Sequence, residues 1–115
     1  MTEPRLIGVY RVENADGVGP YRGPSGGSHP AIKAHGRYGT KSRETHPAPW
    51  EDGLDQRFYG RVFGFTSLES ASAWFAPDEL RRLDRDGYRL RRFWISPDLV
   101  DHGAAQVVFE RKRAR

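Results

Sequence analysis

The sequence lacks cysteine altogether, and it also lacks any long apolar run. Without cysteine, a disulfide scaffold, a thiolate zinc site and a cysteine nucleophile are excluded, and the composition fits a reducing compartment. No apolar stretch approaches the roughly 18 residues that a membrane span needs, and the opening MTEPR has no signal-peptide core. We therefore expect a cytoplasmic protein that does not use a membrane as a partner.

Excess charge of one sign is nearly absent from the body of the chain. Lys and Arg number 19 against 15 Asp and Glu, a net charge of +4. Four of these bases lie together at Arg111, Lys112, Arg113 and Arg115, which leaves 15 bases and 15 acids over residues 1–110. Because 115 residues allow only one domain, we expect a single domain over residues 1–110 and a basic tail over 111–115.

Glycine and proline are concentrated in one segment. Residues 14–53 hold eight of the 13 glycines and five of the eight prolines, in patterns that favour turns over helix or ladder. The same segment carries aromatic residues and three histidines, whereas disordered segments are poor in aromatics. Long loops without secondary structure usually serve a function in compact domains. We therefore interpret residues 14–53 as an ordered, irregular excursion that lines a site.

Regular elements are predicted on both sides of this excursion. Alternating, β-branched and aromatic residues predict strands over residues 6–12, 58–66, 88–95 and 104–110, with a bulge at Arg91–Arg92 where the alternation shifts, and residues 101–103 are expected to form a turn. Thr66 and Glu69 have the spacing of a capping box, which predicts a helix directly after Thr66. A second helix should begin at Pro77 and end before a left-handed Gly87. This order predicts an α+β domain with a largely antiparallel sheet.

The basic residues outside the tail admit two interpretations. Six arginines fall between Arg81 and Arg92, and with the tail they could track phosphates, interleaved with Tyr88, Phe93 and Trp94. Four acids between Asp78 and Asp86 share the predicted helix at three- or four-residue spacings, as in a solvated ion-pair face. Nucleic-acid binding therefore stays an alternative, with the tail as one contact.

A set of polar residues at strand and helix edges suggests a ligand pocket. Arg11 ends the first strand, Thr66 and Ser67 stand where a strand meets a helix, and Gln106 lies on the last strand. An arginine can grip phosphate through its fork, so this set suits a nucleotide-type ligand. The alternative is that Arg11 is an ordinary surface residue and that Thr66 and Ser67 only cap the helix. No metal is expected, because the histidine spacings match no zinc pattern, and His46 with Asp52 is better explained as orienting the loop.

The chain resembles a family of short proteins encoded by phages and prophages. Five segments carry the resemblance: 9–14, 19–21, 46–52, 64–69 with Trp74 and Phe75, and 106–109. It covers most of the chain and implies a small accessory or host-interaction protein inside a bacterium. It does not imply an activity.

A second resemblance is to arginine-type ADP-ribosyltransferases. Val9-Tyr-Arg11 is similar to their first strand, whose arginine holds the NAD pocket together, and Gly64-Phe-Thr-Ser67 is similar to their Ser-Thr-Ser strand. Gln106 falls where these enzymes carry a catalytic acid. The resemblance implies NAD as cofactor and transfer of ADP-ribose. Because a glutamine supplies no negative charge, either another acid such as Glu13 or Asp52 serves, or the protein binds a nucleotide without transferring it.

The leading hypothesis is an ADP-ribosyltransferase-like, NAD-binding protein of a phage, acting on a target in the bacterial cytoplasm. The alternative is a non-enzymatic phage protein that binds a host protein or nucleic acid. In the first hypothesis the catalytic candidates are Gln106, Asp52 and His46. The residues expected to bind the cofactor are Arg11, Tyr21, Thr66 and Ser67.

Overall fold

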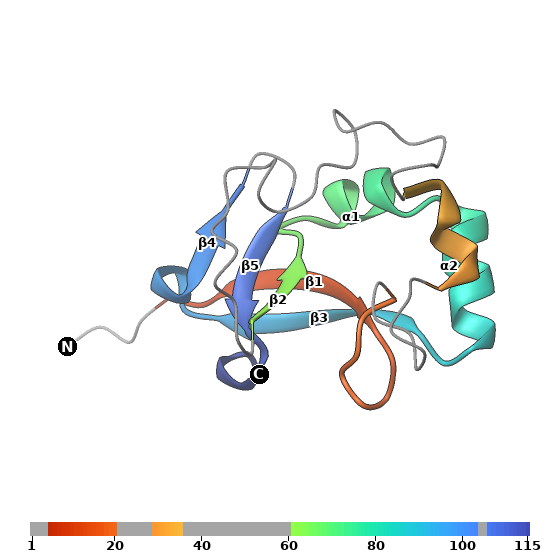
Figure 1. Ribbon diagram of the computed structural model, residues 1–115. Helices are drawn as coiled ribbons and strands as arrows, with labels where there is room; N and C mark the ends of the chain where they lie inside the picture. The colour runs from red at the N-terminus through yellow and green to blue at the C-terminus, as the bar shows by residue number, and fades with distance from the viewer. Residues whose placement is uncertain (1–4, 21–28, 36–60, 104–105) are drawn as a thin grey trace.

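In the part of the chain that the structure describes, five strands form two antiparallel sheets. The computed structural model describes residues 5–20, 29–35, 61–103 and 106–115. Strand β1 (Ile7–Glu13) pairs with β3 (Arg89–Ile95), and β5 (Val107–Glu110) lies between β2 (Arg61–Gly64) and β4 (Val100–His102). In Figure 1 the second sheet lies beside one end of the β1–β3 pair. Together with the two helices, this confirms the predicted α+β class.

Two helices follow β2 directly. They are α1 (Leu68–Trp74) and α2 (Pro77–Arg85); α2 lies at the opposite end of the molecule from β4, and α1 lies between them (Figure 1). Short 3₁₀ turns occur at η1 (Pro30–His35), η3 (Pro97–Leu99) and η4 (Arg111–Arg113). Among the residues described, no helix is both long and apolar enough to cross a membrane.

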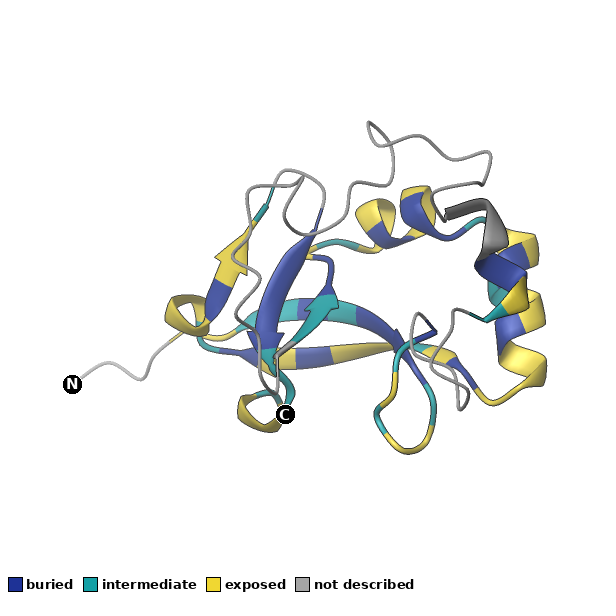
Figure 2. Cartoon of the chain, viewed as in Figure 1, coloured by how far each residue is buried: buried dark blue, intermediate teal, exposed yellow. Residues whose placement is uncertain are grey.

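The two faces of the β1–β3 pair pack in different apolar clusters. Residues with odd numbers, such as Val9 and Phe93, pack with residues of β4 and β5. Residues with even numbers, such as Val12 and Leu90, pack with the helices, whereas the even-numbered residues at the other end of β3 are exposed. Strand β1 therefore has buried residues on both faces, and the two buried residues of β3 share one face; Figure 2 shows the buried segments of both strands. The pair is the partition between two small cores.

This arrangement corrects the predicted bulge at Arg91–Arg92. The register between β1 and β3 runs without interruption from Ile7 opposite Ile95 to Glu13 opposite Arg89. The shift in the apolar alternation arises because the buried face changes along β3. Leu90 faces the helices, whereas Phe93 and Ile95 face the second sheet.

Among the described residues, one isolated β-bridge joins the two sheets. The amide of Tyr10 donates to the carbonyl of Phe65 at 2.7 Å, and the amide of Phe65 donates to the carbonyl of Tyr10 at 2.7 Å. The neighbouring Gly64 makes this approach feasible, because a Cβ at that position would lie 2.6 Å from the Tyr10 carbonyl oxygen. A side chain there would collide with backbone, which cannot move aside cheaply.

The helix boundaries confirm most of the predicted signals and shift one of them. The cap of α1 is Ser67, whose hydroxyl accepts from the amide of Ser70 at 3.0 Å, rather than Thr66. Helix α2 begins at Pro77, and Gly87 has the predicted left-handed conformation with φ of 85°. The Glu79 carboxylate accepts from the amide of Ala76 at 2.8 Å, which satisfies one free donor at the start of α2.

The expected turn at residues 101–103 is wrong in its position. Asp101 and His102 belong to β4 and pair with Val108 and Val107 of β5. The amide of Gly103, the residue after β4, donates to the carbonyl of Gln106, the residue before β5. This bond closes the hairpin. Three residues are too few for a visible alternation, so the strand carried no signal of its own.

Part of the 14–53 excursion contributes to the core. In the described residues 29–35, Ala31 and Ile32 are buried in the same apolar cluster as the helices. His29 anchors this turn, since its ring contacts Asp86 and lies edge-on to Tyr88. At the start of the excursion the Asn14 side chain accepts from the amides of Asp16 and Val18, forming a tight turn.

Candidate functional site

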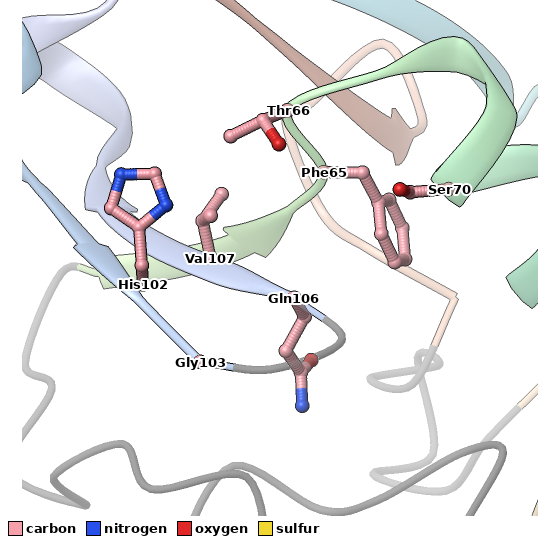
Figure 3. Close-up of a pocket in the computed structure, with 7 residues that line it drawn as sticks. All are labelled: Phe65, Thr66, Ser70, His102, Gly103, Gln106 and Val107. Carbon is pink, nitrogen blue, oxygen red and sulfur yellow. The ribbon is translucent and has the colours of Figure 1, made fainter.

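A polar pocket opens where β4, β5 and the start of α1 meet. It has a volume of about 60 Å³ (Figure 3). Phe65, Thr66 and Ser70 come from the β2–α1 junction, and the lining is completed by residues from the β4–β5 hairpin: His102, Gly103, Gln106 and Val107. Sites for drug-sized ligands usually measure roughly 300–1,000 Å³. The described part of the pocket can therefore hold part of a sugar, but not a whole nucleotide.

Four of the side chains that line this pocket are hydrogen-bonding groups. Thr66 and Ser70 contribute hydroxyls, Gln106 an amide and His102 an imidazole. Each of these groups can donate and accept, depending on tautomer in the case of the imidazole. Among the described residues, the lining contains neither a carboxylate nor an arginine. Such a set matches the hydroxyls of a sugar better than it matches a phosphate.

Two of the predicted site residues meet at this pocket. Thr66 and Gln106 are 40 positions apart in the sequence but line the same space, and Gln106 is buried. Ser67 is not among the lining residues, and its hydroxyl is occupied as the cap of α1. Tyr21, His46 and Asp52 lie outside the described residues.

Arg11 belongs to a different cluster, centred on the buried carboxylate of Glu13. Arg11 donates to Glu13 at 3.1 Å, to the carbonyl of Phe63 at 3.1 Å and to the carbonyl of Gly17 at 3.2 Å. These bonds tie β1 to β2 and to the Asn14 turn. Arg11 therefore holds strands and a turn together, and it does not line the pocket.

Two further arginines reach Glu13 from other parts of the chain. Arg111, 98 residues away, donates two hydrogen bonds of 2.9 Å to the two carboxylate oxygens, and Arg91 lies 3.5 Å from one of them. The guanidinium groups of Arg91 and Arg111 also lie over the ring of Phe93, at 5.7 and 4.3 Å from its centroid. The side chain of Glu13 is 0% exposed, so three cations share one carboxylate that has no water of its own.

The cluster shifts the pKa values of its members. Burial raises the pKa of the Glu13 carboxyl, but the hydrogen bonds and charges of Arg111 and Arg11 together bring it below its ordinary value of 4.5. The hydrogen bonds that Arg111 donates to Glu13 raise the pKa of its guanidinium, although burial opposes this. Glu13 is therefore an anion held by its partners, which suits a structural role.

Sequence reasoning missed several important residues of both clusters. Ser70 and His102 line the pocket, and Arg111 completes the Glu13 cluster. Arg111 was counted with the tail, but residues 111–115 lie against the body, where Arg115 exchanges two backbone hydrogen bonds with Trp94. No local pattern marks these residues, since each depends on segments that are distant in the sequence. Within the ranges described, no group of three His, Cys, Asp or Glu is placed to hold a metal ion.

Comparison with known proteins identifies a family but no activity. Searches of curated proteins and of solved structures find no significant match, so they provide no support for the resemblance to ADP-ribosyltransferases. A family model described as "Bacteriophage T4 Y00F protein" matches residues 1–115. This match agrees with the predicted phage family and covers the whole chain. The chain thus belongs to the bacteriophage T4 Y00F protein family.

Proposed function

We propose that this phage-family protein binds a nucleotide-type ligand, with a ribose in the pocket between Thr66 and Gln106. The observation that carries the proposal is the convergence of those two residues, from separate elements, with Ser70 and His102. A ribose presents neighbouring hydroxyls that both donate and accept, and the four polar side chains can do the same. NAD is the ligand that the sequence resemblance favours.

The chemistry of the lining favours binding over group transfer. Transfer of ADP-ribose passes through a cation-like transition state, which a negative charge beside the sugar must stabilise. The lining residues that the structure describes include no carboxylate, and Glu13 is paired with arginines. We therefore propose that the protein binds its ligand without transferring ADP-ribose. Transfer would need an acid beside the sugar, and Asp52 would be that acid.

The size of the pocket limits how much of NAD it can hold. A space of about 60 Å³ holds only part of one sugar, so the base and the phosphates would have to lie outside it. Ligands that share the ribose but differ in phosphates should therefore compete with each other. Inorganic phosphate alone should not compete.

Calorimetry with NAD, ADP-ribose and adenosine tests the proposal. We expect all three to bind, and we expect Thr66→Val and His102→Ala each to weaken binding roughly 5- to 10-fold, the value of one hydrogen bond. Asp98→Ala is the control, because Asp98 is exposed and does not line the pocket. Absence of binding by the wild type at millimolar ligand would refute the proposal. If the protein releases nicotinamide from NAD, it is an enzyme, and the proposal of a protein that only binds its ligand is wrong.

Arg11→Ala separates a pocket role from a role in the fold. Arg11 holds two carbonyls and Glu13, so the variant should lose stability. If circular dichroism shows that the variant is folded, its affinity for ADP-ribose should match that of the wild type. A folded variant without affinity would instead favour the arginine-type NAD pocket that the sequence suggests.

A further inference from the structure

We infer that the outer face of β3 around Trp94 is a docking surface for single-stranded nucleic acid. Trp94 is 43% exposed, whereas Trp74 and Phe93 are buried in the two cores. An exposed tryptophan keeps a large apolar ring in water, which is unfavourable unless a partner covers it. This surface is distinct from the Thr66–Gln106 pocket, with which it shares no lining residue.

Arg92 and Trp94 form a stacked pair on one side of the strand. The Arg92 guanidinium lies 4.8 Å from the centroid of the Trp94 ring, and both side chains are exposed. Gly8 stands opposite Trp94 in β1, and an added Cβ there would be only 3.6 Å from each side chain. Both side chains therefore lie across the backbone of β1, at ordinary contact distance from this glycine. A guanidinium and an indole side by side are the groups that contact phosphates and bases in single strands.

The end of the chain adds positive charge beside this pair. The backbone of Arg115 is hydrogen-bonded to that of Trp94 at 2.9 and 3.1 Å, which fixes the last residues along the edge of β3. Lys112 and Arg113 precede it and are exposed. Within the parts of the chain that the structure describes, Arg92, Lys112 and Arg115 make no ion pair, and Arg113 has only an exposed contact of 3.4 Å with Glu110. These charges are therefore available to a partner.

An aromatic ring among unpaired cations favours nucleic acid over an acidic protein. An acidic peptide would use the cations but would have no planar group to place on the indole. A single strand alternates phosphates with flat bases, so it can use the cations and the ring at once. A duplex keeps its bases stacked internally, and it should bind more weakly than a single strand of the same length.

Fluorescence anisotropy with labelled 12-nucleotide probes tests this inference. We expect oligo(dT) or oligo(U) to bind with a log–log salt slope near −2, which is about 0.7 for each of three phosphate contacts. Trp94→Ala should raise Kd about 5- to 150-fold, the range for loss of one stacked base. Arg85→Ala removes an exposed charge from α2 instead, and it should change Kd less than about 2-fold.

A second variant keeps the test independent of folding defects. Trp94→Phe retains an aromatic ring, so it should keep most of the affinity while losing the quenching of tryptophan emission by the probe. The inference is overturned if the wild type does not bind either probe, or if Trp94→Ala and Arg85→Ala behave alike. Displacement of the probe by polyglutamate, with no dependence on Trp94, would also overturn it and would indicate an acidic protein partner. Comparison of the affinities for oligo(dT) and oligo(U) shows whether the surface prefers DNA or RNA.

Discussion

At the scale of single residues, the most unusual side chain is Glu13. A fully buried carboxylate is costly unless cations and hydrogen-bond donors replace its water. Arg11 and Arg111 provide three hydrogen bonds of 2.9–3.1 Å, and Arg91 adds charge from the exposed side. Three elements that are far apart in sequence therefore depend on one carboxyl group for their mutual placement.

The stability of the protein should fall at acid pH because of Glu13. The pKa of this carboxyl is lowered in the folded state, so its contribution is complete above its unfolded value of 4.5 and is lost as the pH falls through the folded value. Glu13→Gln should lose roughly 3–5 kcal/mol at pH 7, the usual cost of breaking a buried ion pair. Urea unfolding at pH 7, 5, 4 and 3 measures this, and the deficit of the variant should shrink below pH 4.5.

Glu110→Gln provides the matched control for this prediction. Glu110 also pairs with an arginine, but its side chain is 41% exposed, and such surface pairs contribute little. The account of Glu13 fails if both variants lose the same stability, or if the deficit of Glu13→Gln does not change with pH.

At the scale of elements, the junction of the two sheets depends on the absence of a side chain. Gly64→Ala would place a Cβ 2.6 Å from the carbonyl oxygen of Tyr10 and 3.0 Å from Phe109. We expect a loss of about 1–3 kcal/mol from overpacking, with the bridge between Tyr10 and Phe65 disturbed. Gly8→Ala is the comparison, because its Cβ would meet its neighbours at ordinary contact distances of 3.6 Å. Equal midpoints of thermal unfolding for the two variants would contradict this.

The elements that the sequence predicted correctly are those with local signals. Pro77 and Gly87 mark α2 by their own backbone preferences, and β1 shows its apolar alternation directly. The 3₁₀ turn at residues 30–35 has no such local signal. Ile32 is buried in the apolar cluster that includes the helices, and these contacts are with residues distant in the sequence. For the same reason the excursion was interpreted entirely as a site lining, whereas part of it fills the core.

The candidate site was predictable only in part, and for the same physical reason. Strand ends and helix starts are visible in a sequence, which is why Thr66 and Gln106 were found. His102 was missed because β4 has only three residues, and the pairing of Glu13 with Arg111 was missed because 98 residues separate them. Charge counting placed Arg111 in a tail, although its partner sits inside the protein.

At the scale of the whole molecule, the two ends of the chain are fastened to the same place. Glu13 is the last residue of the first strand, Arg111 follows the last one, and Arg115 continues along β3. The last five residues therefore contribute both to the stability of the fold and to the charge around Trp94.

Deletion of residues 111–115 should destabilise the protein by roughly 3 kcal/mol, because Glu13 loses its bidentate partner while remaining buried. The double variant Lys112→Ala and Arg113→Ala removes two exposed charges and should stay within about 0.5 kcal/mol of the wild type. Chemical denaturation at neutral pH compares the three proteins. If the deletion and the double variant are equally stable, the tail is not part of the folded unit.

The pairing of β1 with β3 also determines when folding can begin during synthesis. Residues 7–13 leave the ribosome about 80 residues before their partner at residues 89–95. At roughly 5–20 residues per second, the first strand waits about 4–16 s with its apolar side chains exposed. This part of the nascent chain should therefore remain unfolded until residues 89–95 have been made, and during that interval it should be a substrate for the chaperones of the cell that makes it.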